Sequence, residues 1–167
     1  SKDGGELRQP AHLRPRGGRF LTASFGHCLI SCSAILLERE LFARLGGFDP
    51  AFPVCEDFEL WLRLLEQTPV GLVPEPLTVK RAGDWPQESQ RLHSMDALRV
   101  QAILKFVANQ SRGAPGESSA EVSAIRTAAR TACEAKLRIL EQGARRHGST
   151  AELDALRLRE QIRAVFP

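Results

Sequence analysis

One stretch orders the rest of this chain: residues 45–64 read L-G-G-F-D-P-A-F-P-V-C-E-D-F-E-L-W-L-R-L. The pair Gly46-Gly47 ends a short apolar-periodic run, because glycine adopts turn conformations that residues with a Cβ resist. Pro50 and Pro53 then keep the chain out of a helix. From Glu56 onwards, apolar residues recur at helical spacing, which predicts an amphipathic helix that follows a loop shaped by glycine and proline.

The acidic pair Glu56-Asp57 at the start of this helix has two interpretations. Acidic residues commonly satisfy the free backbone N–H groups of a helix start, where the helix dipole also holds them ionised. A carboxylate presented at the mouth of a cleft can instead act as a general base that takes a proton from an attacking hydroxyl. The local pattern favours the helix cap, and the two roles are compatible.

The composition predicts one domain with a hydrophobic core. Of the 167 residues, 43% are hydrophobic, and the net charge is only +3. This charge balance indicates no polyanionic partner. The arginines within residues 1–19 suit an anionic ligand, but no basic stripe with interleaved aromatic residues accompanies them, which counts against nucleic acid. No apolar run approaches the ~18–20 residues that span a bilayer.

The four cysteines favour a reduced, cytoplasmic protein. They lie in apolar or helical stretches and lack the dense spacing of a secreted disulfide framework. A zinc site that combines His27 with three of these cysteines is the alternative, but its spacing matches no standard zinc motif. The cysteines are Cys28, Cys32, Cys55 and Cys133.

Periodicity and capping signals predict an α/β chain in which helices predominate. Ser118-x-x-Glu121 and Ser149-x-x-Glu152 are typical of capping boxes at the starts of two C-terminal helices. The expected elements are a short helix or turn at 20–26, strands at 29–36, 70–73 and 77–80, and helices at 38–45, from 56, at 86–109, from 118 to 148 with an interruption near Gly143, and from 149 onwards.

A glycine- and proline-rich stretch at 113–116 marks the one subdomain boundary that the sequence suggests. We therefore expect residues 1–112 to form one unit. Residues 113–167 are then a helical extension that packs on this unit. Pairing of these helices with a partner chain is the alternative.

The run from Ile30 to Arg63, I-S-C-S-A-I-L-L-E-R-E-L-F-A-R-L-G-G-F-D-P-A-F-P-V-C-E-D-F-E-L-W-L-R, resembles the C-terminal half of family 2 glycosyltransferases, which are inverting enzymes with the GT-A fold. The combination of G-G-F-D with E-D-F-E-L-W-L-R carries most of the resemblance. Residues 79–89, 95–106 and 136–148 extend it over most of the chain. The resemblance implies an α/β fold for this segment: a partial GT-A fold, largely helical, with a few short strands.

The resemblance also implies roles for the residues of the central stretch. Asp57 is then the base that deprotonates an acceptor hydroxyl, and Glu56 helps to bind the acceptor or to orient the loop. Phe48 and Asp49 shape the floor of the cleft and contact substrate. Trp61 and Arg63 are expected to support the helix from behind, as core residues.

A second loop supplies the remaining implied site residues. Lys80 and Gln87 are expected to bind substrate. Asp84 stands where the family usually carries a histidine that helps to hold a divalent cation, Mn²⁺ or Mg²⁺, and aspartate is itself a suitable ligand for a hard cation. Its alternative role is that of a residue at the start of a helix.

The implied reaction moves a sugar from a nucleotide-sugar donor to an acceptor hydroxyl. The sequence contains no Asp-x-Asp motif, which belongs to the donor-binding half of such enzymes. We therefore expect that half to precede Ser1, or a homo-oligomer to form, and we expect these residues alone to transfer no sugar. The alternative function is a non-catalytic helical interaction module derived from a glycosyltransferase. The donor and the acceptor stay open, since one fold serves many acceptors.

Overall fold

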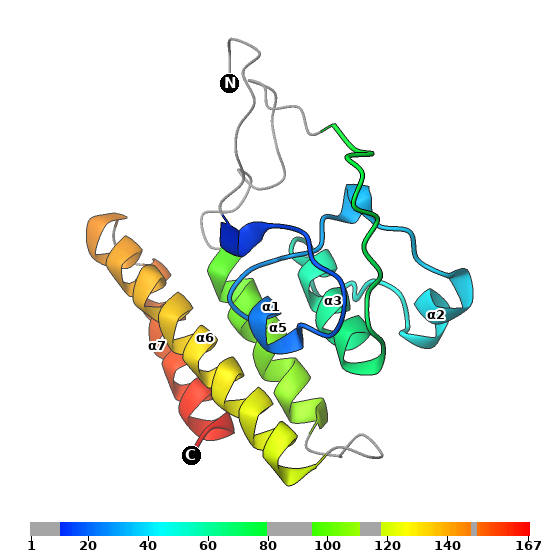
Figure 1. The fold of residues 1–167 in the computed structure, drawn as a ribbon. Coiled ribbons are helices and arrows are strands. Elements are labelled where there is room, and N and C mark those ends of the chain that lie inside the picture. Colours follow the sequence, from blue (N-terminus) through cyan, green and yellow to red (C-terminus); the bar gives the residue numbers. More distant parts are fainter. Residues whose placement is uncertain (1–10, 80–94, 111–117, 148–149) are drawn as a thin grey trace.

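The computed structural model describes residues 11–79, 95–110, 118–147 and 150–167 (Figure 1). Within these ranges the chain forms helices joined by turns and extended segments. Two short 3₁₀ helices occupy Ala11–Leu13 and Cys32–Ala34. The α-helices are α1 (Leu21–Ser24), α2 (Arg39–Arg44), α3 (Glu56–Gln67), α5 (Met95–Gln110), α6 (Ser119–His147) and α7 (Thr150–Val165).

The helices expected from periodicity in the first half of the chain are present. α1 lies within the short helix or turn expected at 20–26, and α2 lies within the helix expected at 38–45. The turn after α2 contains Gly46 and Gly47, with φ values of 83° and 68°, a left-handed conformation that glycine adopts without steric strain. α3 begins at Glu56, as expected, and ends just before Thr68-Pro69.

The α/β expectation is wrong, because the described ranges form an all-α structure without a β-strand. A strand requires a neighbour that satisfies its backbone N–H and C=O groups. The expected strands at 29–36, 70–73 and 77–80, the last described only to residue 79, find almost no such neighbour within the described residues. The exception is one antiparallel bridge, in which Gly18 N donates to Val70 O at 2.7 Å and Val70 N donates to Gly18 O at 3.0 Å. Leu36 is 99% exposed, so the apolar pattern of the first segment does not reflect complete burial.

Helix α5 lies at the centre of the core, with α3 on one side and α6 and α7 on the other (Figure 1). Val100, Ile103 and Val107 are completely buried. The ring of Phe106 packs against that of Phe25, with 5.6 Å between the ring centroids. Residues on opposite sides of the helix, such as Val100 and Ala102, are buried because neighbours cover both sides, whereas Gln101, Ala108 and Asn109 are exposed. The expected beginning of the helix, at 86–94, lies outside the described residues.

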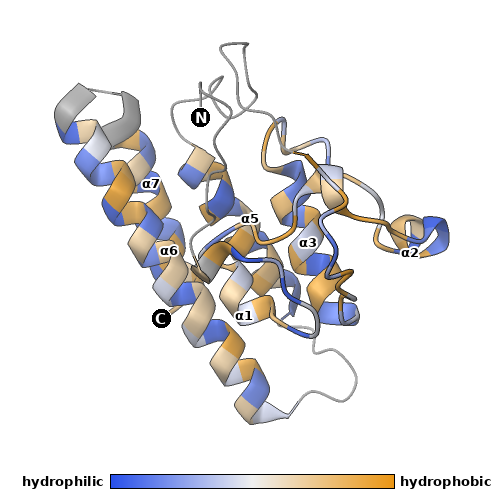
Figure 2. Ribbon diagram, turned by 45° about the horizontal axis from the view of Figure 1, so that its top comes forward, coloured by the Kyte–Doolittle hydropathy of each residue, from blue (hydrophilic) through white to orange (hydrophobic). Residues whose placement is uncertain are grey.

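Helices α6 and α7 pack against each other and against α5. Figure 2 shows hydrophobic and hydrophilic residues alternating along both helices, as expected for helices with one packed face. The predicted capping box is confirmed: Glu121 Oε2 accepts from Ser118 N at 2.9 Å and from Ser118 Oγ at 2.8 Å, and Glu121 N donates to Ser118 Oγ at 3.3 Å. The predicted interruption near Gly143 is wrong, since α6 continues to His147. The second predicted capping box begins at Ser149, and the predicted subdomain boundary lies at 113–116. Ser149 and residues 113–116 are outside the described residues.

A buried lysine fastens α6 to the elements before it. Lys136 is 6% exposed. Its Nζ donates to the carbonyl oxygen of Gly26 at 2.9 Å and lies 3.4 Å from Asp96 Oδ1. Burial lowers the pKa of Lys136 below its ordinary value, against the opposing effect of Asp96. α6 is therefore joined by polar contacts as well as by apolar packing to the loop after α1 and to the start of α5.

We expect Ser118→Ala to destabilise the protein by about 1 kcal/mol, because the start of α6 then loses its reciprocal side-chain cap. Urea denaturation followed by circular dichroism measures the change. Ser119→Ala is the matched control, since Ser119 is exposed and is the first residue of the helix. Equal stabilities of the two variants would contradict the role of the capping box.

Candidate functional site

The acidic pair begins α3 directly after a left-handed residue. Cys55 is the N-cap residue, with φ 62° and ψ 17°, and makes no side-chain capping bond. A residue other than glycine in this region is uncommon. Because α3 begins directly after Cys55, Glu56 and Asp57 both fall in the first turn of the helix, where the backbone N–H groups are free.

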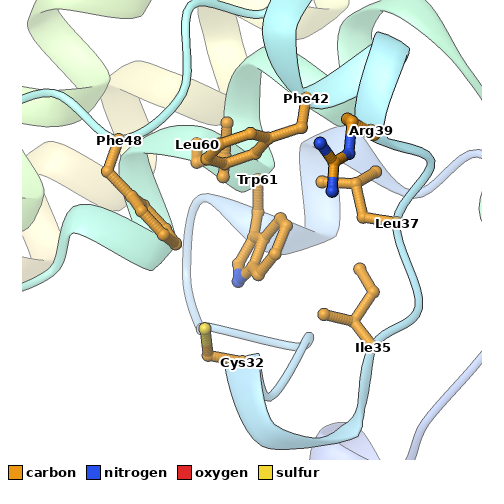
Figure 3. A pocket seen from close by; sticks show the side chains of 8 residues that line it. All are labelled: Cys32, Ile35, Leu37, Arg39, Phe42, Phe48, Leu60 and Trp61. Atoms are coloured by element: carbon orange, nitrogen blue, oxygen red, sulfur yellow. The ribbon is translucent and has the colours of Figure 1, made fainter.

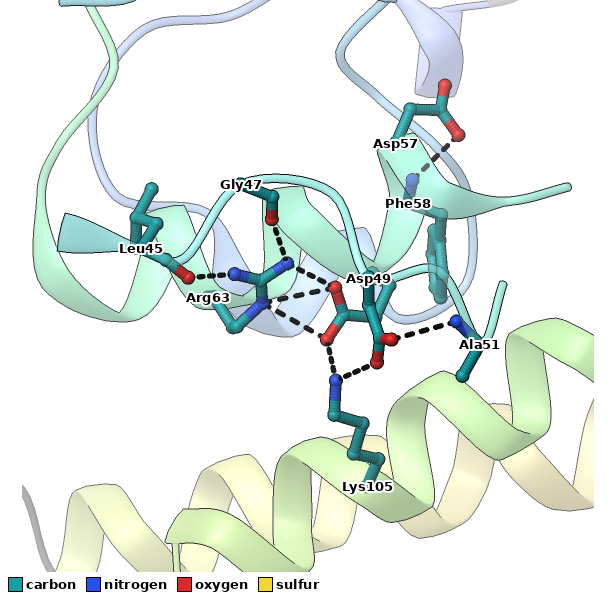
Figure 4. A network of polar contacts seen from close by, with 9 residues as sticks. Leu45, Gly47, Asp49, Ala51, Asp57, Phe58, Arg63 and Lys105 are labelled. Carbon is teal, nitrogen blue, oxygen red and sulfur yellow. Dashed lines mark hydrogen bonds and ion pairs between the residues drawn. The ribbon is translucent and has the colours of Figure 1, made fainter. Parts of the chain in front are cut away.

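The carboxylate of Asp57 is oriented by one of its two oxygens. Oδ1 accepts from the backbone N of Phe58 at 2.7 Å (Figure 4), while Oδ2 accepts a weak hydrogen bond from the Cys28 thiol, whose sulfur lies 3.8 Å away. The first contact is a helix-start contact of the kind expected from the capping interpretation. Both Glu56 and Asp57 are half-buried, and within the described residues neither carboxylate pairs with a lysine or arginine. The capping interaction therefore leaves Oδ2 of Asp57 with one weak described donor, the Cys28 thiol, and with no cation.

Another acid of the same helix, Glu59, is buried and fully engaged. Glu59 is 3% exposed. Its oxygens accept from Arg63 Nε at 3.0 and 3.1 Å and from Lys105 Nζ at 2.6 Å, and they also pair with the terminal nitrogen Nη2 of Arg63. Burial of a carboxylate is tolerated when cations and hydrogen bonds compensate its lost hydration. Both conditions are met here.

The same cations hold the turn that precedes α3 (Figure 4). Arg63 donates to the carbonyl oxygen of Gly47 at 2.8 Å and also to that of Leu45. Lys105, from α5, donates to Asp49 Oδ2 at 2.5 Å, and Ala51 N donates to Asp49 Oδ1 at 2.9 Å. We call Asp49, Glu59, Arg63 and Lys105 the ion network.

The ion network perturbs its members in the expected directions. Burial lowers the pKa of Lys105, but its hydrogen bonds to Asp49 and Glu59 outweigh this effect, so its pKa lies above the ordinary value. The hydrogen bond from Lys105 lowers the pKa of Asp49, and the bond from Ala51 N adds to it. The carboxylate of Asp49 is thus held in its ionised form by neighbouring donors.

Sequence reasoning predicted part of this arrangement. Arg63 has the supporting role that was expected of it, while the expectation that Asp49 shapes the floor of a cleft stays a prediction. A direct contact of Asp49 with substrate stays a prediction. The roles of Glu59 and Lys105 were missed. The four-residue spacing of Glu59 and Arg63 was an available signal, since such pairs share a helix face.

Phe48 projects from the turn into a pocket (Figure 3). Its ring packs edge-on against that of Phe42, with 5.5 Å between centroids. Gly47 lies close to the same ring: a Cβ there would come within 3.3 Å of Phe42 Cζ. The pocket has a volume of about 320 Å³ and was not predicted from the sequence. It is lined by Cys32, Ile35, Leu37, Arg39, Phe42, Phe48, Leu60 and Trp61.

Three predicted site residues, Lys80, Asp84 and Gln87, lie outside the described residues, so their roles stay predictions. Among the residues described, no group of three or more histidine, cysteine, aspartate or glutamate side chains could hold a metal ion. The zinc alternative on His27 and the nearby cysteines therefore finds no support there, and all four cysteines are free thiols.

We expect Arg63→Met to destabilise the protein by about 3 kcal/mol, because the buried Glu59 carboxylate loses a cation and two turn carbonyls lose their donor. The measurement is urea denaturation. Arg44→Met is the matched control, because Arg44 is an exposed arginine of α2. A loss below about 0.5 kcal/mol, as for an ordinary surface change, would show that the ion network does not hold the turn.

Alkylation by iodoacetamide should report the closeness of Cys32 to the acidic pair. Burial, followed by the charges of Asp57 and Glu56, raises the pKa of the Cys32 thiol, which lowers its reactive thiolate fraction near neutral pH. Asp57→Asn removes one of these charges, so the pKa falls and alkylation of Cys32 becomes faster. The rate is followed by peptide mass spectrometry, with Glu160→Gln on α7 as the control. An unchanged rate in Asp57→Asn would contradict this arrangement.

The comparisons with known proteins assign no family. No family model matches the chain, and neither a curated protein nor a solved structure matches it. None of the helices in the described ranges has the length and apolar character needed to cross a membrane.

Proposed function

We propose that this chain carries the acceptor-side acids of an inverting glycosyltransferase of the family 2 type. One observation carries the proposal: Glu56 and Asp57 stand at the start of α3, half-buried and unpaired with any described cation, while the turn before them is fixed by the ion network. A fixed carboxylate with an available oxygen is what a general base requires. The resemblance of residues 30–63 to such enzymes points to the same chemistry.

In the proposed reaction, Asp57 Oδ2 takes the proton of an acceptor hydroxyl. The hydroxyl oxygen then forms a bond to the anomeric carbon of the donor sugar. The bond from that carbon to the nucleoside diphosphate breaks on the opposite face, so the configuration inverts. Because Phe58 N holds Oδ1, the carboxylate is already oriented before the acceptor arrives, which lowers the reorganisation needed in the transition state.

The donor site belongs, in this proposal, to residues outside this sequence, which contains no Asp-x-Asp motif. The described residues also do not supply a set of metal ligands. We therefore assign no step to a divalent cation, and Asp84 stays a predicted ligand. The four free thiols support the cytoplasmic location that we propose.

A second candidate, a non-catalytic interaction module, is favoured by apolar side chains that stand in solvent. Leu36, Val73, Leu77 and Val79 are large hydrophobic residues of extended segments, and Leu36 is 99% exposed. Single exposed apolar residues are common, whereas several in unpaired segments suit a protein partner. The two candidates make opposite predictions for Asp57.

In the full-length product of the gene that encodes this chain, we expect Asp57→Asn to lower turnover about 10²–10⁴-fold, because the general base is lost. Release of nucleoside diphosphate from a panel of nucleotide sugars measures turnover. Asp154→Asn, at an exposed position of α7, is the matched control. Circular dichroism verifies that both variants are folded.

Turnover in folded Asp57→Asn within about twofold of the unsubstituted protein would refute the role of the base and favour the interaction module. The 167-residue chain alone is expected to release no nucleoside diphosphate above background. Release by that chain would show that the donor site needs no residues beyond these.

A further inference from the structure

The pocket beside α3 has the composition of a small-molecule site. Its walls come from the short 3₁₀ helix (Cys32) and the extended segment after it (Ile35, Leu37), from α2 (Arg39, Phe42), from the turn (Phe48) and from α3 (Leu60, Trp61), as Figure 3 shows. Its volume of about 320 Å³ lies at the lower end of the usual range of ligand pockets. Such pockets are mainly apolar and contain a few polar groups that orient the ligand.

The polar groups of this pocket include two hydrogen-bond donors that lack a partner among the described residues. The guanidinium of Arg39 is exposed at the pocket and makes no ion pair or hydrogen bond with the described part of the chain. Trp61 is 3% exposed, and its indole Nε1 is buried without a hydrogen-bond acceptor among the same residues. The described lining of the pocket contains no carboxylate. The charge of the site therefore suits an apolar ligand that carries an anionic group.

The pocket adjoins the acidic pair along α3. Leu60 and Trp61 follow Glu56 and Asp57 by four positions each, so each pair shares one face of the helix, about one turn (~5.4 Å) apart. Side chains of a helix lean towards its N-terminus, which brings the indole of Trp61 closer to Asp57. Cys32, which lines the pocket, is close enough for both acids to act on its thiol.

We propose that this pocket is the acceptor subsite and that the acceptor is an amphiphilic hydroxy acid. Its apolar body fills the space between Phe42, Phe48 and Trp61, its anionic group pairs with Arg39, and its hydroxyl reaches Asp57. The assignment of an acceptor rests on the proposed function, whereas binding of the amphiphile by the pocket does not depend on catalysis.

The test is isothermal titration of the 167-residue chain with 10-hydroxydecanoate. We expect saturable binding with one site. Leu37→Glu places a charge in the apolar wall and should weaken binding more than tenfold. Leu36→Glu is the matched control: the same substitution at the neighbouring leucine, which is 99% exposed and does not line the pocket, should leave affinity unchanged.

The charge of Arg39 is tested with a second pair of variants. Arg39→Met should weaken binding about fivefold, as expected for the loss of an exposed ion pair, and Arg44→Met should not. The uncharged probe 1,10-decanediol should bind both variants equally. Absence of saturable binding, or equal losses in Leu37→Glu and Leu36→Glu, would overturn the pocket assignment. If Arg39→Met and Arg44→Met bind 10-hydroxydecanoate with equal affinity, the inference that Arg39 pairs with an anionic group of the ligand is wrong.

The outcomes also separate this inference from the proposed function. Asp57→Asn should bind 10-hydroxydecanoate within about threefold of the unsubstituted chain, because only the hydroxyl contact changes. Binding that is retained while Asp57→Asn keeps full turnover would leave a ligand pocket but overturn its role as an acceptor subsite. If Asp57→Asn loses turnover but 10-hydroxydecanoate does not bind in the pocket, Asp57 keeps its role as the base and the inference of an amphiphilic acceptor is wrong.

Discussion

The buried carboxylate of Glu59 is the constraint on which the rest of the central stretch depends. A carboxylate that is 3% exposed must be matched by cations, and here it has two, Arg63 from its own helix and Lys105 from α5. Each cation also makes a second set of contacts, since Arg63 holds the carbonyls of the glycine turn and Lys105 holds Asp49. The turn, α3 and α5 are therefore joined around one negative charge, and their relative positions cannot change without exposing or unpairing it.

This constraint explains why acids of one short stretch differ so much in their surroundings. Residues of an α-helix are ~100° apart around its axis, so Asp57 and Glu59 point roughly 200° apart. Glu59 faces α5 and Lys105, whereas Asp57 faces the loop that carries Cys28. The network that fixes the helix thus engages Asp49 and Glu59 and leaves Asp57, on the other side of α3, without a described cation. Helix α3 thus carries both Glu59, which fixes the helix against α5, and Asp57, whose carboxylate has no described cation.

Sequence reasoning succeeded where the signal is local. Periodicity located α3, the glycine pair predicted the left-handed turn, and Ser118 with Glu121 predicted a cap that the structure confirms. It failed for the strands, because an apolar run reports a tendency towards burial and cannot report whether a neighbouring strand is present to pair with it. It also missed the ion network, since Lys105 lies 46 residues from Glu59 and only the tertiary fold brings them together. The pocket was missed for the same reason, since its walls form only when residues 32–48 fold against α3.

The two interpretations of Asp57 that the sequence left open turn out to use different atoms. The cap contact occupies Oδ1, which accepts from Phe58 N, and the general-base role requires only Oδ2, whose one described donor is the weakly bonded thiol of Cys28. A carboxylate that rotates freely must lose rotational entropy to accept a proton from one fixed direction. A carboxylate that is anchored through its other oxygen has already lost this entropy on folding. The cap is thus the means by which a base at this position would be oriented. The same helix then extends one turn further to Trp61 and the apolar pocket, so that the position of the acid and the position of the pocket are set together by the register of α3.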